Sequence, residues 1–328
     1  MSTFRCKNLL VTGGAGFIGS NFIDYVLSKY DSLKIYNLDL LTYAGELNNT
    51  KSFSENSRYK FIHGDICDEI LLDKIFKSYK IDGVINFAAE SHVDNSIKNP
   101  KIFIETNVMG TFNLLKVSYE NWMISNFNYF SDFKYARFHQ ISTDEVYGSI
   151  QKGSFSEVDP CNPNSPYSAS KASADMLVRS FSKTYGLNTV ISRCSNNFGP
   201  KQHKEKFIPM IIDSIKRNIP IKVYGDGNNI RDWLYVIDHC KAIDLIYNQA
   251  KNSSIYNIGG KNELTNLELI NLIFSLFEDK QKKYINFVSD RFGHDKRYSV
   301  DISKIKKEFN WEPTNDIKKT LKETIINI

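Results

Sequence analysis

The chain has 328 residues, of which 41% are hydrophobic and 24% are charged, and both fractions are ordinary for a globular protein. No apolar run approaches the roughly 20 residues that span a bilayer, and the net charge of +5 comes from 42 basic and 37 acidic residues spread along the chain. This composition argues against membrane insertion and nucleic-acid binding, and its small positive excess favours an anionic small ligand.

The lysine clusters, the apolar stretch near the N-terminus and the cysteines each give a further expectation. The lysine clusters KQHKEK and DKQKK are interrupted by acidic or neutral residues, so we interpret both as solvated surface. The apolar stretch near the N-terminus is too short for a signal peptide and leads into a glycine motif, so we expect a first strand there. An odd, dispersed set of cysteines without a CxxC pair predicts reduced thiols, a cytoplasmic protein and no metal site. These cysteines are Cys6, Cys67, Cys161, Cys194 and Cys240.

In the first half of the chain, apolar segments of strand length alternate with helix-like stretches. This rhythm is typical of repeated βαβ units and predicts an α/β fold with a Rossmann-type doubly wound parallel sheet. Residues 121–136 interrupt the rhythm and are expected to form an inserted loop. The predicted strands are NLLVTG (8–13), IYNLD (35–39), YKFIHGD (59–65), GVINFAA (83–89) and FHQIST (138–143).

The composition changes after about residue 193, where Asn, Gly and Pro separate short apolar pieces, and we expect loops to dominate. Residues 236–249 and 254–259 again have the patterns of a helix and a strand, which predicts a brief return to the first domain. The second, smaller α/β domain is therefore discontinuous. The predicted domains are residues 1–193 with 236–259, and residues 194–235 with 260–328.

A glycine motif follows the first predicted strand. In VTGGAGFIGSN, Gly13 permits a tight turn, Gly16 lets the backbone approach a pyrophosphate, and Gly19 lets the next helix pack closely on the strand. A structural turn is the alternative for such a triplet. Asp39 ends the second strand at the position where a carboxylate accepts the ribose hydroxyls of NAD and repels the 2′-phosphate of NADP. The sequence therefore predicts an NAD site.

Residues at the ends of the third and fourth strands fall where the rest of a dinucleotide would lie. Asp65 ends the third strand and is placed near the adenine, although capping of the next helix is an equal alternative for it. The small residues Ala88 and Ala89 end the fourth strand, where the pyrophosphate needs space.

A YSASK segment follows Pro166 and places Tyr167 and Lys171 four residues apart on one helix face. A surface pair is the usual meaning of this spacing. Beside a dinucleotide motif, however, a lysine ammonium can favour the tyrosine phenolate and lower the tyrosine pKa, which makes a base for a sugar hydroxyl.

These motifs support a resemblance to a known group of enzymes. TGGAGFIG, the strand ending in Ser-Thr and YSASK resemble the extended short-chain dehydrogenase/reductase superfamily. Over nearly the whole chain, the sequence resembles the dTDP-glucose 4,6-dehydratase family. The segments that carry this finer resemblance are AAESHVDNS, STDEVYG, SRCSNNFGP, KFIP, IRDWLYV, YNIGG and DRFGHDKRY.

Two adjacent carboxyls, Asp144 and Glu145, follow Thr143 directly. Elimination of water needs an acid for the leaving hydroxyl and a base for the C5 proton, and adjacent carboxyls can share these roles if their environments separate their pKa values. The resemblance implies that Asp144 is the acid and Glu145 the base, with Thr143 holding the C4 oxygen. Capping of the following turn is the structural alternative for both carboxyls.

The resemblance also implies binding residues for both ligands. Those for NAD lie in the first predicted domain, with one exception, and those for the nucleotide sugar lie mostly in the second. Surface ion pairing is the alternative for Arg231 and Arg297. The expected NAD-binding residues are Gly13, Gly16, Phe17, Ile18, Gly19, Asp39, Thr42, Asp65, Ile66, Phe87, Ala88, Ala89, Ser91, Thr106, Tyr167, Lys171 and Asn197. The expected substrate-binding residues are Ser91, Thr143, Asn196, Lys206, Phe207, Lys222, Tyr224, Arg231, Asn266, Arg297 and Tyr298.

The loop after the fourth strand carries one departure from the family pattern. Glu90 and His92 are expected near the glucosyl ring, although His92 can equally be structural. Asn95 stands where the family usually has arginine, which leaves the electrostatics of this loop open.

The resemblance implies conversion of dTDP-D-glucose to dTDP-4-dehydro-6-deoxy-D-glucose, a step toward dTDP-rhamnose or another deoxysugar. The nucleotide base and the hexose rest on the resemblance alone. A 4,6-dehydratase for another nucleotide sugar, a sugar-nucleotide 4-epimerase and a non-catalytic NAD-binding protein are the alternatives, and Asp144-Glu145 argues against the last two. A homodimer formed through the helices beginning near Thr106 and Tyr167 is also implied.

Overall fold

The computed structural model describes residues 4–277, 284–290, 293–314 and 316–327. A seven-stranded sheet forms its centre, in the order β12-β8-β7-β4-β1-β2-β3, and every neighbouring pair is parallel. This confirms the predicted fold class. The strands are β1 (Asn8–Thr12), β2 (Lys34–Asp39), β3 (Tyr59–His63), β4 (Gly83–Asn86), β7 (Arg137–Thr143), β8 (Thr189–Cys194) and β12 (Ser254–Ile258).

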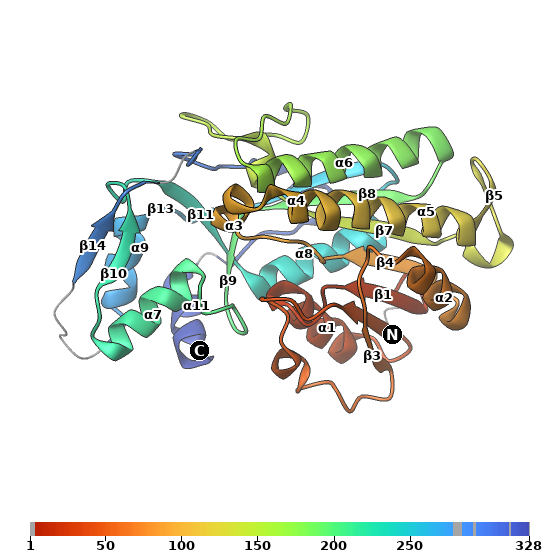
Figure 1. Ribbon diagram of the computed structural model, residues 1–328, viewed down its shortest axis with the longest axis horizontal. Coiled ribbons are helices and arrows are strands. Elements are labelled where there is room, and N and C mark those ends of the chain that lie inside the picture. The colour runs from red at the N-terminus through yellow and green to blue at the C-terminus, as the bar shows by residue number, and fades with distance from the viewer. Residues whose placement is uncertain (1–3, 278–283, 291–292, 315, 328) are drawn as a thin grey trace.

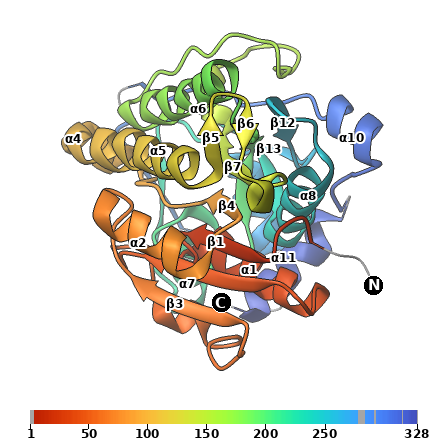
Figure 2. The ribbon, with the colours of Figure 1, turned by 90° about the vertical axis from the view of Figure 1, so that its right-hand side faces the viewer.

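Helices cover both faces of this sheet, as the end-on view in Figure 2 shows. Successive residues of β1 alternate between the faces: Leu10 packs with one group of helices, and Leu9 and Val11 pack with the other. The first group consists of α2 (Glu69–Tyr79), α5 (Thr111–Trp122) and α6 (Pro166–Tyr185), and the second of α1 (Phe17–Lys29) and α8 (Val236–Gln249).

The strand order reverses between β1 and β4, because the chain builds β1, β2 and β3 outward and then starts again on the other side of β1. At such a reversal the loops that leave two neighbouring strands diverge and open a crevice at the carboxyl ends of the strands. The topology therefore places the ligand site at the ends of β1 and β4.

Apart from α8 and β12, and α10, which packs on β12, much of the chain after β8 forms smaller sheets and helices toward the left of Figure 1. The expectation that loops dominate there is wrong, because helices and strands follow one another through this part of the chain. Helix α7, for example, buries an isoleucine face formed by Ile208, Ile211, Ile212 and Ile215. The two-domain division stays a prediction. The elements are β9 (Asn196–Phe198), α7 (Phe207–Arg217), β10 (Ile221–Tyr224), β11 (Ile230–Tyr235), β13 (Glu263–Thr265), α9 (Asn266–Phe274), β14 (Ile285–Val288), α10 (Ser303–Phe309) and α11 (Ile317–Asn327).

Residues 121–136 are not the irregular loop that the sequence suggested. They contain the antiparallel hairpin of β5 (Met123–Ser125) and β6 (Asn128–Tyr129), followed by the 3-10 turn η3 (Ser131–Phe133). Short helical elements also surround the sheet: η1 (Leu47–Thr50), α3 (Val93–Lys98), α4 (Pro100–Phe103), the π-helical η2 (Ile104–Gly110) and η4 (Asp144–Tyr147). In the described ranges, no helix has both the length and the hydrophobicity needed to cross a bilayer.

Two fully buried histidines predict acid sensitivity. Burial lowers the pKa of His239 to about 3 and that of His139 well below its ordinary value. The unfolded chain takes up protons near pH ~6.5 that the folded chain excludes, so their contribution to stability is present above that pH and is lost as the pH falls. We expect His239→Gln to flatten the loss between pH 6 and pH 4 by up to about 1.4 kcal/mol per pH unit in urea unfolding. An unchanged slope would contradict this assignment.

Candidate active site

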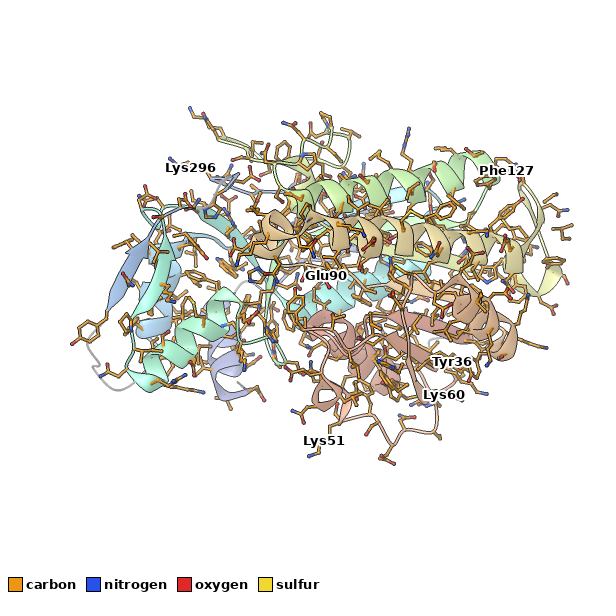
Figure 3. All side chains as sticks on the ribbon, in the orientation of Figure 1. Tyr36, Lys51, Lys60, Glu90, Phe127 and Lys296 are labelled. Atoms are coloured by element: carbon orange, nitrogen blue, oxygen red, sulfur yellow. The ribbon has the colours of Figure 1, made fainter. Side chains whose placement is uncertain are left out.

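A cavity of about 1040 Å³ opens at the carboxyl ends of the central strands, between the large sheet and the smaller sheets. Its two sides touch: the Lys206 ammonium donates to the Ser91 carbonyl oxygen at 3.2 Å, and the Tyr224 hydroxyl donates to Asp94 Oδ2 at 3.2 Å. Figure 3 places Glu90, which also lines the cavity, near the middle of the molecule between the two sides. The volume has room for a dinucleotide together with a second ligand.

The glycine loop brings bare backbone to the cavity. Gly13 has φ +70°, and a Cβ there would lie 2.6 Å from the Ala88 nitrogen, so the residue needs glycine for both reasons. A Cβ at Gly16 would meet nothing nearer than the Gly13 carbonyl oxygen at 3.2 Å, and no side chain caps α1, which begins at the next residue. This uncapped helix N-terminus beside a close backbone approach suits a pyrophosphate.

We expect Gly13→Ala to weaken NAD binding by 100-fold or more, because the added methyl pushes the loop away from Ala88, at a stability cost of a few kcal/mol (~2–3). Isothermal titration and urea unfolding measure the two effects. Gly153→Ala is the matched control, since Gly153 also has positive φ but a Cβ there meets nothing within 4 Å. It should cost about 1 kcal/mol and leave NAD affinity unchanged. Equal affinity losses in both variants would contradict the account.

Asp39 anchors the same loop. Its Oδ2 accepts from the Ala15 N–H and its Oδ1 from the Leu41 N–H, both at 2.8 Å, and burial raises its pKa although these bonds oppose the shift. The carboxyl also lines the cavity, where a ribose would meet it. The helix-capping alternative for Asp65 is wrong, because Asp68 caps α2 while Asp65 accepts from the Cys67 N–H at 2.8 Å.

Helix α6 presents the tyrosine and the lysine. Ser165 caps the helix, and its side chain exchanges hydrogen bonds with Ser168. Tyr167 and Lys171 point inward and are 9% and 4% exposed. The Lys171 ammonium donates to the Ile141 carbonyl oxygen at 2.7 Å, which ties α6 to the end of β7. The predicted helix face therefore meets the strand that carries the two carboxyls.

The expected lowering of the Tyr167 pKa is wrong for the protein by itself. Burial, and next the nearby Glu145 carboxylate, raise the pKa of Tyr167 well above its ordinary value, and a hydrogen bond from Thr143 opposes this only in part. Burial also lowers the pKa of Lys171. An additional positive charge in the cavity would favour the phenolate.

The two adjacent carboxyls occupy different environments. Asp144 is 3% exposed, and burial, followed by repulsion from Glu145 and Asp232, raises its pKa well above the ordinary value. Burial thus favours the protonated form of this carboxyl, which is the form that a proton donor needs. The capping alternative is wrong: Thr143 caps the η4 turn by accepting from the Glu145 N–H at 3.3 Å.

The two expected arginines are placed differently. Arg231 lines the cavity, with its guanidinium 4.3 Å from the centre of the Tyr298 ring and one nitrogen donating to the Asp295 carbonyl oxygen at 2.9 Å. Arg297 does not line the cavity, and its guanidinium donates to both carboxylate oxygens of Glu263, at 2.7 and 2.8 Å. Arg297 thus shows the ion pairing that is the alternative to substrate binding.

All other predicted site residues come together in the cavity, except Tyr298, which lines a small neighbouring cavity together with Glu145 and Arg231. His92 and Asn95 line the main cavity as well. Among the described residues, no group of His, Cys, Asp and Glu is arranged to hold a metal ion.

The segment KQHKEK is solvated surface in part, as the sequence suggested, because Lys204 and Glu205 are exposed, but it also borders the cavity. Gln202, His203, Lys204 and Glu205 line the cavity with Lys206. Lys206 belongs both to this segment and to the KFIP motif, and this overlap was a sequence signal that the segment borders the ligand site. The second lysine cluster, DKQKK, lies outside the described residues.

Comparison with known proteins agrees with this geometry. The family model described as GDP-mannose 4,6 dehydratase matches residues 10–324. The chain belongs to this family. It is 42% identical to the dTDP-glucose 4,6-dehydratase of Salmonella typhimurium, covering 97% of this chain and 91% of the relative. It is 44% identical to the enzyme of the same name from Neisseria gonorrhoeae, covering 99% and 96%.

Solved structures place the fold in the same group. The crystal structure of a dTDP-glucose 4,6-dehydratase from Streptomyces venezuelae, which contains NAD, has a TM-score of 0.89 at 41% identity and covers 97% of this chain and 96% of its own. A UDP-glucose 4-epimerase from Thermotoga maritima has a TM-score of 0.86 at 27% identity, covering 98% of both chains. The fold is thus shared with epimerases, and the higher identity is with the 4,6-dehydratases.

Proposed function

We propose that the protein is an NAD-dependent dTDP-glucose 4,6-dehydratase, which converts dTDP-D-glucose to dTDP-4-dehydro-6-deoxy-D-glucose and water. The observation that carries the proposal is the carboxyl pair: Asp144 is buried and has a raised pKa, and Glu145 follows it in the same cavity as Tyr167. The names of the relatives at 42–44% identity support the same substrate.

NAD fits the first half of the cavity. The uncapped N-terminus of α1 and the bare backbone at Gly16 would hold the pyrophosphate, Asp39 would hold a ribose, and Asn197 would face the nicotinamide. When bound, NAD supplies an acceptor and later donor of hydride, and its oxidised ring supplies a positive charge that favours a Tyr167 phenolate.

The side chains divide the proton transfers. Tyr167 takes the proton of the C4 hydroxyl as the C4 hydrogen leaves, and Thr143 donates a hydrogen bond to that oxygen. The resulting ketone acidifies the C5 proton, which Glu145 removes. Asp144 gives its proton to the departing C6 hydroxyl, so that water leaves, and a hydrogen returned to C6 with a proton at C5 completes the product.

The nucleotide half of the substrate would lie toward α7, β10 and β11. Lys206, Lys222 and Arg231 bring positive charge to the cavity and would bind the diphosphate. Asn266 would contact the nucleotide. Arg297 would join them only by leaving its ion pair with Glu263.

Incubation of the purified protein with dTDP-glucose, followed by mass spectrometry, tests the proposal. We expect the sugar nucleotide to lose one water without net accumulation of NADH. An unchanged mass together with a galactose epimer would support the 4-epimerase alternative instead. Parallel incubation with UDP-glucose tests which nucleotide base the protein prefers, and faster turnover of the uridine nucleotide would overturn the thymidine assignment.

We also propose a homodimer formed through α4, η2 and α6. These elements pack against one another and expose apolar side chains, whose burial in a dimer interface would be favourable. Ile102, Ile104, Met109 and Met176 are 38–49% exposed. We expect Met109→Glu to convert a dimer to a monomer in sedimentation velocity. Lys34→Glu, on the exposed start of β2, is a control that should remain dimeric. A monomeric wild-type protein would contradict the proposal.

The free cysteines support a reducing compartment, and we propose the cytoplasm. A role in dTDP-rhamnose or another deoxysugar pathway is proposed from the product. The two-domain division is proposed with the boundaries given above, on the basis that α8 and β12 pack with the large sheet.

A further inference from the structure

A small cavity of about 50 Å³ lies beside Glu145 and contains the hydroxyl end of Tyr298. Tyr298 is 6% exposed and lies between two carboxyls: its oxygen is 2.9 Å from Asp295 Oδ2 and 3.4 Å from Glu145 Oε2. The sequence predicted Tyr298 as a substrate contact and gave Asp295 no role. Asp295, Tyr298 and Glu145 thus form a chain of contacts that ends at the carboxylate proposed as the catalytic base.

The single hydroxyl proton of Tyr298 has two possible acceptors, and the shorter contact places it on Asp295. The second oxygen of Asp295 accepts from the Asn164 amide at 2.7 Å, so this buried carboxylate has a donor on each oxygen. Asn164 therefore fixes the carboxylate, the carboxylate fixes the hydroxyl, and the Tyr298 oxygen presents a lone pair toward Glu145.

We propose that Asp295 is a positioning residue that turns the Tyr298 hydroxyl proton away from Glu145 and thereby keeps Glu145 a strong base. The inference rests on the proposed function, in which Glu145 removes the C5 proton. A hydroxyl that donated to Glu145 would stabilise the carboxylate and weaken the base. A lone pair at the same place stabilises the protonated Glu145 that forms when the C5 proton is taken.

Other groups near Glu145 are the same in every variant considered below. Arg231 lines both cavities and favours the carboxylate, whereas burial raises the pKa of Asp144 and of Tyr167 and so favours the uncharged form of each. The titratable groups that line the small cavity with Glu145 are Arg231, His294 and Tyr298. The main cavity adds Asp144, Tyr167 and Lys171, together with further charged residues such as Glu90, Asp94 and Lys206. A difference between variants at Asp295 therefore reports the direction of the Tyr298 hydrogen bond.

Asp295→Asn reverses this direction. The Asn164 amide still needs an acceptor, so the new amide oxygen faces Asn164 and the new amide N–H₂ faces the Tyr298 oxygen, which turns the hydroxyl proton to Glu145. We expect the acid limb of the pH profile for C5 hydrogen exchange with deuterated water to move about one unit lower, with a rate up to about tenfold lower at pH 7.5. The KM for dTDP-glucose should change less than twofold.

The exchange of partners supplies the matched control. In the double variant Asp295→Asn/Asn164→Asp, the new carboxylate accepts from the new amide, whose oxygen again accepts from Tyr298, so the acid limb should return to the wild-type pH. A third variant, Tyr298→Phe, has no hydroxyl proton and should lose rate without any movement of the acid limb to lower pH.

Several results would overturn the inference: an unmoved acid limb in Asp295→Asn, a double variant that behaves like the single one, or a lower acid limb in Tyr298→Phe. The double variant and Tyr298→Phe decide the matter if Asp295→Asn does not fold in urea-unfolding assays. Wild-type protein that makes no dehydrated product would instead refute the proposed function, so the two failures are distinguishable.

Discussion

Replacing Glu145 with Gln is expected to stop dehydration while C4 oxidation continues. The amide keeps the size of the side chain but cannot take the C5 proton, so exchange of that proton with deuterated water should fall roughly 10²–10⁴-fold. Reduced nicotinamide should build up to at most one equivalent per site, because the oxidised sugar cannot proceed. Stopped-flow absorbance and NMR of the recovered sugar measure the two steps separately.

Glu157→Gln is the control for this variant. Glu157 is, like Glu145, a partly buried carboxyl, but it accepts from the Asn257 N–H and does not line the cavity, so turnover should stay within twofold of wild type. If the Glu145 variant exchanges the C5 proton at the normal rate, another group is the base.

Replacing Tyr167 with Phe should block the earlier step. Without the phenolic oxygen no side chain accepts the C4 hydroxyl proton, so both cofactor reduction and C5 exchange should fall by about 10³-fold or more. The contrast with Glu145→Gln is informative, because one variant should accumulate reduced nicotinamide and the other should not. Rapid mixing of each variant with substrate gives the comparison.

Tyr147→Phe is matched to this change. Tyr147 is a buried tyrosine that donates to Asn257 Oδ1 at 2.9 Å and stacks on Phe155, outside the cavity. Its loss should cost about 1–3 kcal/mol of stability and leave the chemistry intact. Cofactor reduction at the wild-type rate in Tyr167→Phe would show that another group accepts the C4 proton.

The fold was largely readable from the sequence because parallel strands buried on both faces give nearly continuous apolar runs, as in the stretch around Leu9, Leu10 and Val11. The hairpin β5–β6 was not, since its strands are short and Ile124 and Phe127 are exposed, so the usual alternation of polar and apolar residues is missing. In Figure 3, Phe127 lies at the end of the molecule farthest from the small sheets.

The cavity residues were predictable where local chemistry dictates the residue type. Gly13 needs positive φ, and Tyr167 and Lys171 share a helix face, so neighbouring sequence reveals them. Asp295 was missed because its role depends on a contact with Asn164, which is 131 residues away in the sequence. Glu205 was missed as a cavity residue because a charged segment by itself resembles ordinary surface.

Electrostatic predictions from sequence failed for a related reason. The spacing of Tyr167 and Lys171 suggested a lowered tyrosine pKa, but burial and the Glu145 carboxylate, which spacing does not reveal, raise that pKa instead. Arg297 was predicted to bind substrate because it stands in a motif that resembles the family. In the folded chain its guanidinium instead forms an ion pair with Glu263.

The most direct test of the central claim uses dTDP-glucose that carries deuterium at C4. If one cavity oxidises C4, removes water and returns the same hydrogen, the product should carry the deuterium in its C6 methyl group and a solvent-derived hydrogen at C5. NMR of the product distinguishes these positions. Deuterium lost to water, retained at C4 of an epimer, or found on free reduced nicotinamide would contradict the account.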